Sequence, residues 1–482
     1  MKKLHIEKGV RSIFFMACSV LVLISRNALG ETEYIVKNSD YNESTNSGLA
    51  SEYKKAKKTA VHLGLSERKY LGEVADLTKS GSEIIRIVQK ATSWNPSIKS
   101  ASESIQEQLQ FVEVARSGYY PKIQGGLKTG YDSSFPKGGN SQQFELTASQ
   151  VLYDFGKVSG SVETSLAGVD QREAEARLSI DKVILDTASA YLEVQRYQQL
   201  VDIAKKQIIN LKSVSELARR RTDLGASNHS DYVQTASRIE GAKVVELQYS
   251  ANLERWRSTL LNLLGEARLK PVTNDFPQVL EMSCQTPSAD IQENPEVQAA
   301  QARAKAVRSQ AAEARAAGLP TVSLDPILSH RLSGDPGFDQ DRTRYGVFIN
   351  VTMPIYQGGS IVAGQAASER AAAAAQANLD NTRLNAMQGL QQNISQQKDL
   401  QLSLLALSSR EKTIVETREI YRQQYQELGS RPLLDLLNAE QEVFQSHADH
   451  QNTLSNLRLL KINCLFQQGL LRSAFDIERD SN

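Results

Sequence analysis

Apolar residues recur every three or four positions over two very long stretches of the chain. From Tyr191 to Ala218 the steps average about 3.4 residues, which is close to the coiled-coil period. No proline interrupts residues 137–270 or 355–431, where strong helix formers dominate. The pattern predicts a helix from about Lys157 to Arg221, roughly 100 Å long at 1.5 Å per residue. Such a helix must pack against similar helices, and small residues such as those from Ala371 to Ala375 predict a close approach.

Alternation of apolar and polar residues with period two predicts four β-strands, two before each long helix. The pattern is clearest from Tyr345 to Met353, where every second side chain is apolar and only Phe348 departs. Residues 143–151 alternate more weakly. Each of these strands is predicted to pair, through a turn-rich loop, with the segment before it, 321–332 or 123–131. One apolar face per strand is typical of strands that span a membrane as part of a barrel.

Aromatic side chains gather near the ends of these segments, as they do at membrane interfaces. They are Tyr119, Tyr120, Tyr131, Tyr153, Phe155, Tyr345 and Tyr356. Four strands cannot close a barrel, because small barrels need about eight, and exposed apolar edges in a monomer would aggregate. Three copies of the chain would supply twelve strands and leave no edge. Two soluble β-hairpins that cap helical hairpins are the alternative.

The chain appears as two similar halves. Asn95-Pro96 recurs as Asn294-Pro295, 199 residues later, and Leu224-Gly225 recurs as Leu428-Gly429, 204 residues later. This repeated order predicts a duplicated unit of about 200 residues. The expected organisation is a signal peptide at 1–30, a polar extension at 31–81, a first repeat at 82–264, a connector at 265–293, a second repeat at 294–471 and a tail at 472–482.

The N-terminus has the pattern of a secretory signal. Basic residues between Lys2 and Arg11 precede an apolar run from Ile13 to Ile24, and Ala28 and Gly30 suit cleavage before Glu31. The run is too short to span a bilayer comfortably. We therefore expect the chain to be exported.

Cleavage would leave two cysteines, Cys284 and Cys464. In an oxidising compartment they either form a disulfide or stay as two separate buried thiols, and their spacing does not decide between these.

Charge and motifs exclude several functions. The chain has 56 Lys and Arg residues against 55 Asp and Glu, so it lacks the basic footprint of a nucleic-acid-binding protein. No phosphate-binding loop or catalytic constellation is found. His447 and His450 share one helix face, but no strong third ligand accompanies them, so solvated helix surface is the better interpretation than a metal site. We expect no enzyme activity, no cofactor and no metal.

In this order the landmarks resemble the TolC-like outer-membrane channel family, from about residue 82 to 471. The resemblance rests on the duplication, the Asn-Pro openings, the motif Tyr153-Asp-Phe-Gly156, the motif Met353-Pro-Ile-Tyr-Gln-Gly-Gly359 and the two Leu-Gly turns. It implies a mainly α chain with a small membrane β-barrel contribution. A homotrimer would build a 12-stranded barrel in the outer membrane of a Gram-negative bacterium and an α-helical tunnel through the periplasm. The connector and the chain ends would form a belt around that tunnel.

The stretch from Leu428 to Phe444 looks like the subgroup that serves type I secretion, notably adhesin export, as does Ala218 to Ser227. This implies a passive conduit with a periplasmic adaptor and an inner-membrane transporter of ABC type. The nearest alternative is a channel for multidrug or metal efflux. A more distant one is an exported coiled-coil structural protein without a pore.

Residues at the two Leu-Gly turns are the candidate functional residues. Gly225 and Gly429 suit the left-handed conformation that ends a helix, and Asp231 and Asp435 would complement the dipole of the returning helix. The resemblance also places Asp435 near the periplasmic aperture, with Arg431 retained. Some family members carry a second acid where this chain has Asn438, and a locking tyrosine where it has Gln426. The adaptor-docking residues that the resemblance implies are Leu224, Gly225, Ala226, Leu428, Gly429 and Ser430; the alternative is two ordinary turns.

Overall fold

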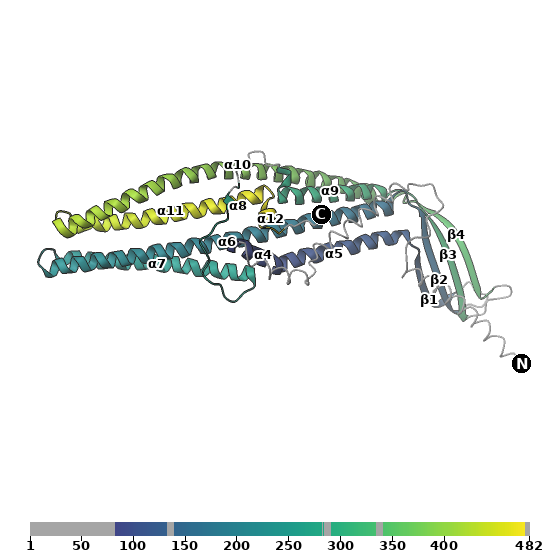
Figure 1. The fold of residues 1–482 in the computed structure, drawn as a ribbon. Helices are drawn as coiled ribbons and strands as arrows, with labels where there is room; N and C mark the ends of the chain where they lie inside the picture. The colour runs from purple at the N-terminus through teal and green to yellow at the C-terminus, as the bar shows by residue number, and fades with distance from the viewer. Residues whose placement is uncertain (1–81, 133–138, 282, 284–290, 334–340, 478–482) are drawn as a thin grey trace. The chain divides into compact units, whose positions relative to one another are not determined.

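The computed structural model describes residues 82–132, 139–281, 283, 291–333 and 341–477 (Figure 1). The predicted signal peptide and polar extension lie outside the described residues, as do parts of the predicted connector and tail. Cys464 is fully buried and disulfide-bonded. Cys284, its partner in the disulfide alternative, lies outside the described residues.

Two series of elements follow each other, and each has a helix, two strands and a long helical hairpin in that order (Figure 1). The first series comprises α4 (Glu83–Trp94), α5 (Pro96–Arg116), η2 (Ser117–Tyr119), β1 (Lys122–Asp132), β2 (Gly139–Tyr153), α6 (Lys157–Asp223) and α7 (His229–Leu264). The second comprises α9 (Pro295–Ala316), β3 (Thr321–Ser333), β4 (Thr343–Thr352), α10 (Ser360–Gln423), the π-helical turn η4 (Gln424–Leu428), α11 (Leu433–Gln467) and α12 (Leu471–Ala474). The short elements α8 (Gln278–Glu281) and η3 (Ile291–Glu293) lie between them.

Two asparagine side chains start α5 and α9. Asn95 accepts a hydrogen bond from the backbone N–H of Ser97 at 3.0 Å, and Asn294 accepts one from Glu296 at 2.9 Å. The proline after each asparagine takes the first helical position, where its missing N–H removes no intrahelical bond. The two helices begin where the Asn-Pro landmarks predicted.

The two long helices also match their prediction: α6 has 67 residues and α10 has 64. α6 packs against α5, α7, α9 and α11, and its predicted seam is buried. The fully or nearly buried seam residues are Tyr191, Val194, Val201, Ala204, Leu211, Val214 and Ala218. α10 differs, because within the run from Ala371 to Ala375 only Ala375 is buried. No helix in the described part of the chain has both the length and the apolar character to cross a bilayer.

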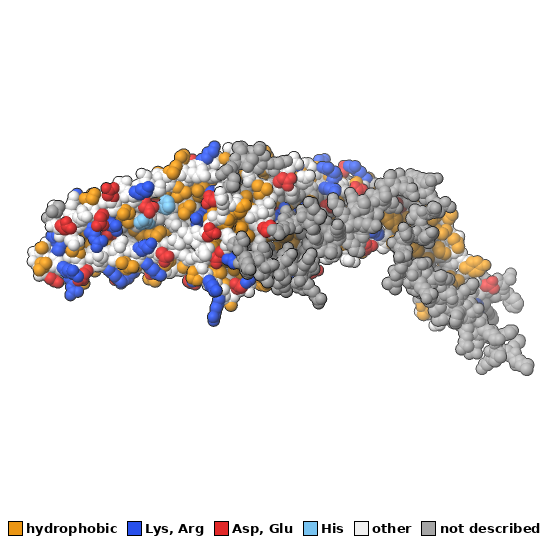
Figure 2. Space-filling view, in the orientation of Figure 1, with side chains coloured by type: hydrophobic (Ala, Val, Ile, Leu, Met, Phe, Trp, Pro, Cys, Tyr) orange, Lys and Arg blue, Asp and Glu red, His pale blue; other side chains and the backbone are white. Residues whose placement is uncertain are grey.

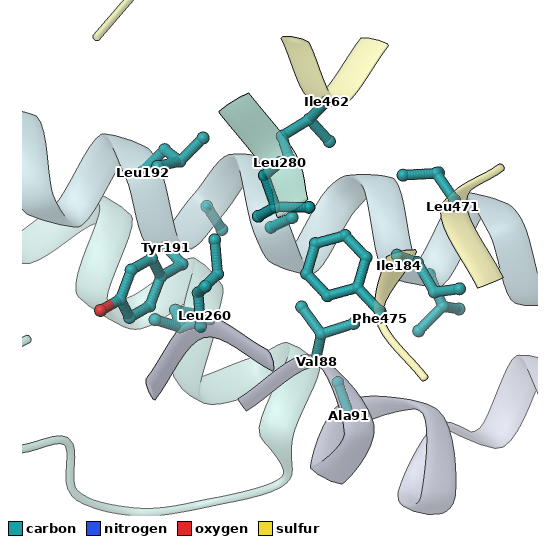
Figure 3. Close-up of a cluster of buried hydrophobic side chains, with 14 of the residues drawn as sticks. Val88, Ala91, Ile184, Tyr191, Leu192, Leu260, Leu280, Ile462, Leu471 and Phe475 are labelled. Atoms are coloured by element: carbon teal, nitrogen blue, oxygen red, sulfur yellow. The ribbon is translucent and has the colours of Figure 1, made fainter. Parts of the chain in front are cut away.

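The main hydrophobic core forms where α4, α6, α7, α8, α11 and α12 converge (Figure 3). Leu280 from α8 and Phe475 from the end of the chain are fully buried in it. A polar contact lies beside the core. The Tyr191 hydroxyl donates to Glu83 at 3.1 Å, and the same carboxylate accepts the backbone N–H of Thr273 at 2.7 Å. These bonds tie the segment after α7 to α4 and α6.

Two ion pairs fasten neighbouring segments to the long helices. Lys461 of α11 pairs with Glu281 of α8. The Nε atom of Arg472 in α12 lies 3.3 Å from the carboxylate of Asp181, a fully buried residue of α6. The short helices α8 and α12 are thus fixed by charge as well as by apolar contact.

Arg472→Ala is expected to destabilise the protein by about 3–5 kcal/mol, because it removes the guanidinium that lies 3.3 Å from the fully buried carboxylate of Asp181. The measurement is the urea midpoint of the purified protein. Arg303→Ala, which removes an exposed guanidinium from α9, is the control. Equal midpoints for the two variants would contradict the role of this ion pair.

The four strands form one antiparallel sheet in the order β1-β2-β3-β4. The predicted pairs β1–β2 and β3–β4 are confirmed, and a further pairing of β2 with β3 joins them. Each corner between sheet and long helix turns at a glycine in the left-handed conformation, Gly156 (φ 90°) and Gly359 (φ 80°). The carboxylate of Asp154 accepts the N–H groups of Gly156 at 3.0 Å and Val158 at 2.7 Å, which caps the start of α6.

Candidate functional site

The sheet has one apolar face and one polar face. The strand register places Leu146 opposite Leu328, which in turn faces Tyr345, and Ile123 faces Ala148. Because side chains alternate along a strand, every second residue shares this face. Its apolar members are Ile123, Leu127, Tyr131, Phe144, Leu146, Ala148, Val322, Leu324, Pro326, Leu328, Tyr345, Val347, Ile349 and Val351. The alternation predicted for residues 345–353 is therefore confirmed over β4, and the weaker one predicted for residues 143–151 is confirmed at Phe144, Leu146 and Ala148.

The opposite face carries polar groups that bond to one another across the strands. Asp325 of β3 accepts hydrogen bonds from Ser149 of β2 at 2.6 Å, from Ser323 at 2.9 Å and from Asn350 of β4. Lys128 and Glu145 form an ion pair between β1 and β2 on the same face. Phe348, which departed from the predicted alternation, also lies on this side.

Much of the apolar face is exposed. Tyr345 is 88% exposed, Ile349 69% and Val347 66%, and Figure 2 shows hydrophobic side chains open to the surroundings at the sheet. Further exposed apolar residues, Tyr120, Ile355 and Tyr356, stand where strands meet helices. A large exposed apolar patch marks a surface that contacts lipid or another protein.

At the turn between α6 and α7 the helix ends in a Schellman motif. Gly225 takes the left-handed conformation with φ 74°, and the N–H of Ala226 donates to the carbonyl of Arg221 at 2.8 Å. Leu224 is 83% exposed at the tip. Asp231 lies in the first turn of α7, as predicted, and accepts a hydrogen bond from Ser227.

At the turn between α10 and α11, Arg431 organises the local contacts. Its guanidinium donates to Asp435 at 3.2 Å and to Gln424 at 3.1 Å, and it lies 4.3 Å from the ring centre of Tyr421. Asp435 is in the first turn of α11. Gly429 ends the π-helical turn with φ 58°. Arg431 and Asp435, predicted separately, are thus brought together.

The other two predicted aperture residues lie apart from this pair. Asn438 accepts a hydrogen bond at 3.3 Å from Arg238 of α7, so it faces the neighbouring hairpin. Gln426 is exposed on the π-helical turn, as is Ser430 beyond it. The contact of Asn438 with α7 was not predicted.

The sequence alone did not point to Arg221 and Tyr425, which join the two hairpins. The guanidinium of Arg221 donates to the carbonyl of Tyr425 and lies 4.7 Å from the centre of its ring. Tyr425 is 3% exposed and packs with apolar residues of α6, α7 and α11. Burial raises the pKa of its hydroxyl, although Ser227 and Arg221 act in the opposite direction.

The family model described as outer membrane efflux protein matches residues 87–266 and 286–459, which is most of the chain. The chain belongs to the outer membrane efflux protein family. It is therefore an outer-membrane protein, in agreement with the exposed apolar face of its sheet. The matched residues include both helical turns and all four strands.

Individual members of the outer membrane efflux protein family are distant. The probable efflux pump outer membrane protein TtgC of Pseudomonas putida is 24% identical over 298 residues, 58% of this chain. That alignment spans only 60% of the length of TtgC. Outer membrane protein TolC of Vibrio cholerae is 21% identical over 78% of this chain and 87% of its own. The crystal structure of CusC shares the fold, with a TM-score of 0.73 and 18% identity over 82% and 95% of the two chains.

Proposed function

We propose that three copies of this chain form an outer-membrane channel that serves as a passive conduit out of the periplasm. The observation that carries the proposal is the sheet, with its exposed apolar face and its internally bonded polar face. Three such sheets would close into a 12-stranded barrel by pairing β4 of one copy with β1 of the next. The apolar face would then contact lipid and the polar face would line the pore.

The helices support the same assembly. Helices α7 and α10 carry exposed apolar side chains that no element of the described chain covers. They are Val233, Val244, Leu247, Leu384, Met387, Leu402 and Leu405. Packing α7 of one copy against α10 of the next would bury them and build a tunnel of long helices.

The proposed partners are a periplasmic adaptor at the helix tips and an inner-membrane transporter. The exposed tip at Leu224 to Ala226 and its counterpart at Leu428 to Ser430 are the proposed docking residues. The resemblance of residues 428–444 to type I secretion channels favours a transporter of ABC type and a protein cargo. The name of TtgC favours the second candidate function, efflux of small molecules by the same channel.

Mass spectrometry of the proteins that the host releases or displays, with and without this gene, separates the two functions. Loss of one very large, repeat-rich protein from the mutant is the result expected for type I secretion. An unchanged set of proteins together with altered tolerance to drugs or metals would instead favour efflux. An absence of trimers from outer-membrane extracts would contradict both candidate functions.

Asp435→Asn is expected to lower the cation selectivity of the channel in a planar bilayer. In the wild type the carboxylate offsets Arg431, 3.2 Å away, so the variant leaves one uncompensated positive charge per copy near the proposed aperture. The reversal potential under a salt gradient measures the change. Asp380→Asn, on α10 and far from the turn, is the control. An unchanged reversal potential in Asp435→Asn would contradict the assignment of Asp435 to the aperture.

A further inference from the structure

A layer of polar side chains, of which Gln207 and Glu440 are buried, lies between the α10–α11 hairpin and α6, next to the apolar cluster at the tips. Its members come from all three helices and are charged or carry amides. They are Gln207 and Asn210 of α6, Arg418 and Arg422 of α10, and Glu440 and Gln441 of α11. The layer is one of the places where the second hairpin rests on the first through polar contacts, alongside the bond of Arg221 to Tyr425 and that of Arg238 to Asn438.

Glu440 is poorly compensated for its burial. It is 2% exposed, one oxygen lies 3.8 Å from the guanidinium of Arg418, and the other accepts a long hydrogen bond of 3.4 Å from Asn210. A carboxylate taken out of water needs close ion pairs and several short hydrogen bonds to stay ionised without a large penalty. At this site Glu440 has one ion pair and one hydrogen bond, and the distances of both are long.

We propose that Glu440 is a proton-linked positioning residue that holds the α10–α11 hairpin on α6 when it is protonated and releases it more readily when it is ionised. This inference rests on the proposed channel function. If the tip opens by moving this hairpin away from α6, Glu440 gains water in the open state. Water stabilises the carboxylate, so the proton is bound more tightly in the packed state than in the open one.

The direction of the pH effect follows from the difference between the pKa values of Glu440 in the packed and open states. Burial raises the pKa of Glu440 in the packed state, Arg418 and Arg422 lower it by a smaller amount, and Glu419 raises it. In the open state the pKa falls back toward its ordinary value. Acid therefore favours the packed, closed hairpin, and the closed state loses stability relative to the open one as the pH rises through the range between the two pKa values.

Other titratable groups on the hairpin must be separated from this effect. α6 contributes the uncharged amides of Gln207 and Asn210 to the layer, and the hydroxyl of Ser213, which accepts a hydrogen bond from Arg422 at 3.0 Å. Along the α10–α11 seam, His447 and His450 face Glu411 with Nδ1–oxygen distances of 2.9 and 3.9 Å. These histidines link α10 to α11 and not the hairpin to α6, so Glu411→Gln tests their share.

The test is the open probability of full-length trimers in a planar bilayer from pH 5 to pH 8. We expect the wild type to open more as the pH rises, with a change of about tenfold per protomer for each unit of difference between the two pKa values. Glu440→Gln, which keeps the shape and stays neutral, is expected to open equally rarely at every pH. Glu442→Gln, an exposed carboxylate two residues further along α11, is the matched control and is expected to behave as the wild type.

A pH response that persists in Glu440→Gln, or one that disappears in Glu411→Gln, would overturn the proposal. Hydrogen exchange of the wild type gives a second test that needs no variant. Exchange of the α6 amides around residues 207–210 is expected to quicken as the pH rises, beyond the intrinsic effect of pH seen at residues 162–169. Equal behaviour of the two segments would overturn the inference, whereas trimers without any conductance would overturn the proposed channel itself.

Discussion

Leu146→Arg is expected to abolish the assembly of trimers in the outer membrane. Leu146 lies in the middle of the apolar face of β2, so in the proposed barrel the new guanidinium would face lipid. A charge at the bilayer midplane costs about 2–4 kcal/mol, and the trimer would carry three. The measurement is the yield of heat-resistant trimers in outer-membrane extracts.

Thr147→Arg is the matched control, because the next residue of the same strand lies at the same depth on the polar face. There the guanidinium would point into the pore, and we expect trimers in nearly wild-type amount with altered ion selectivity. Loss of trimers in both variants, or in Thr147→Arg alone, would show that the faces are assigned the wrong way round or that the strands do not form a barrel.

Arg221→Ala is expected to open the channel. Arg221 is the side chain that joins the end of α6 to the π-helical turn after α10, through the carbonyl and the ring of Tyr425. A hydrogen bond from a charged donor contributes about 1.5–3 kcal/mol, so its loss would shift the opening equilibrium about 10- to 100-fold per copy. The open probability of single channels in a bilayer measures this.

Arg220→Ala, one residue earlier, supplies the control. Arg220 pairs with Glu216 within α6 and is largely exposed. We expect its channels to stay closed as the wild type does. An Arg221 variant as closed as the Arg220 variant would mean that other contacts, such as Arg238 with Asn438, hold the hairpins together.

Local patterns in the sequence were sufficient to predict the elements of the fold. The helix predicted from Lys157 to Arg221 runs from Lys157 to Asp223, because its signal is a long, uninterrupted period of apolar residues. The two faces of the sheet follow in the same way from period two. The left-handed glycines Gly225 and Gly429 were predictable because few other residues adopt that conformation readily.

Contacts between distant segments were not predictable in this way. Arg221 and Tyr425 are 204 residues apart, and nothing in either local pattern indicates the other. The same holds for Glu440, whose position on a helix of mixed residues gives no sign of its burial. The run from Ala371 to Ala375 led to an expectation of close packing that the single chain satisfies only at Ala375, since most of the surface of α10 is exposed.

In the proposed channel the polar face of the sheet lines a conducting pore. Thr147→Cys and Leu146→Cys channels in a planar bilayer, treated with a charged thiol reagent that does not cross membranes, test it most directly. If the polar face lines the pore, the single-channel current falls in three steps for Thr147→Cys, one per copy, and stays unchanged for Leu146→Cys. Block of Leu146→Cys channels with no effect on Thr147→Cys channels would contradict it.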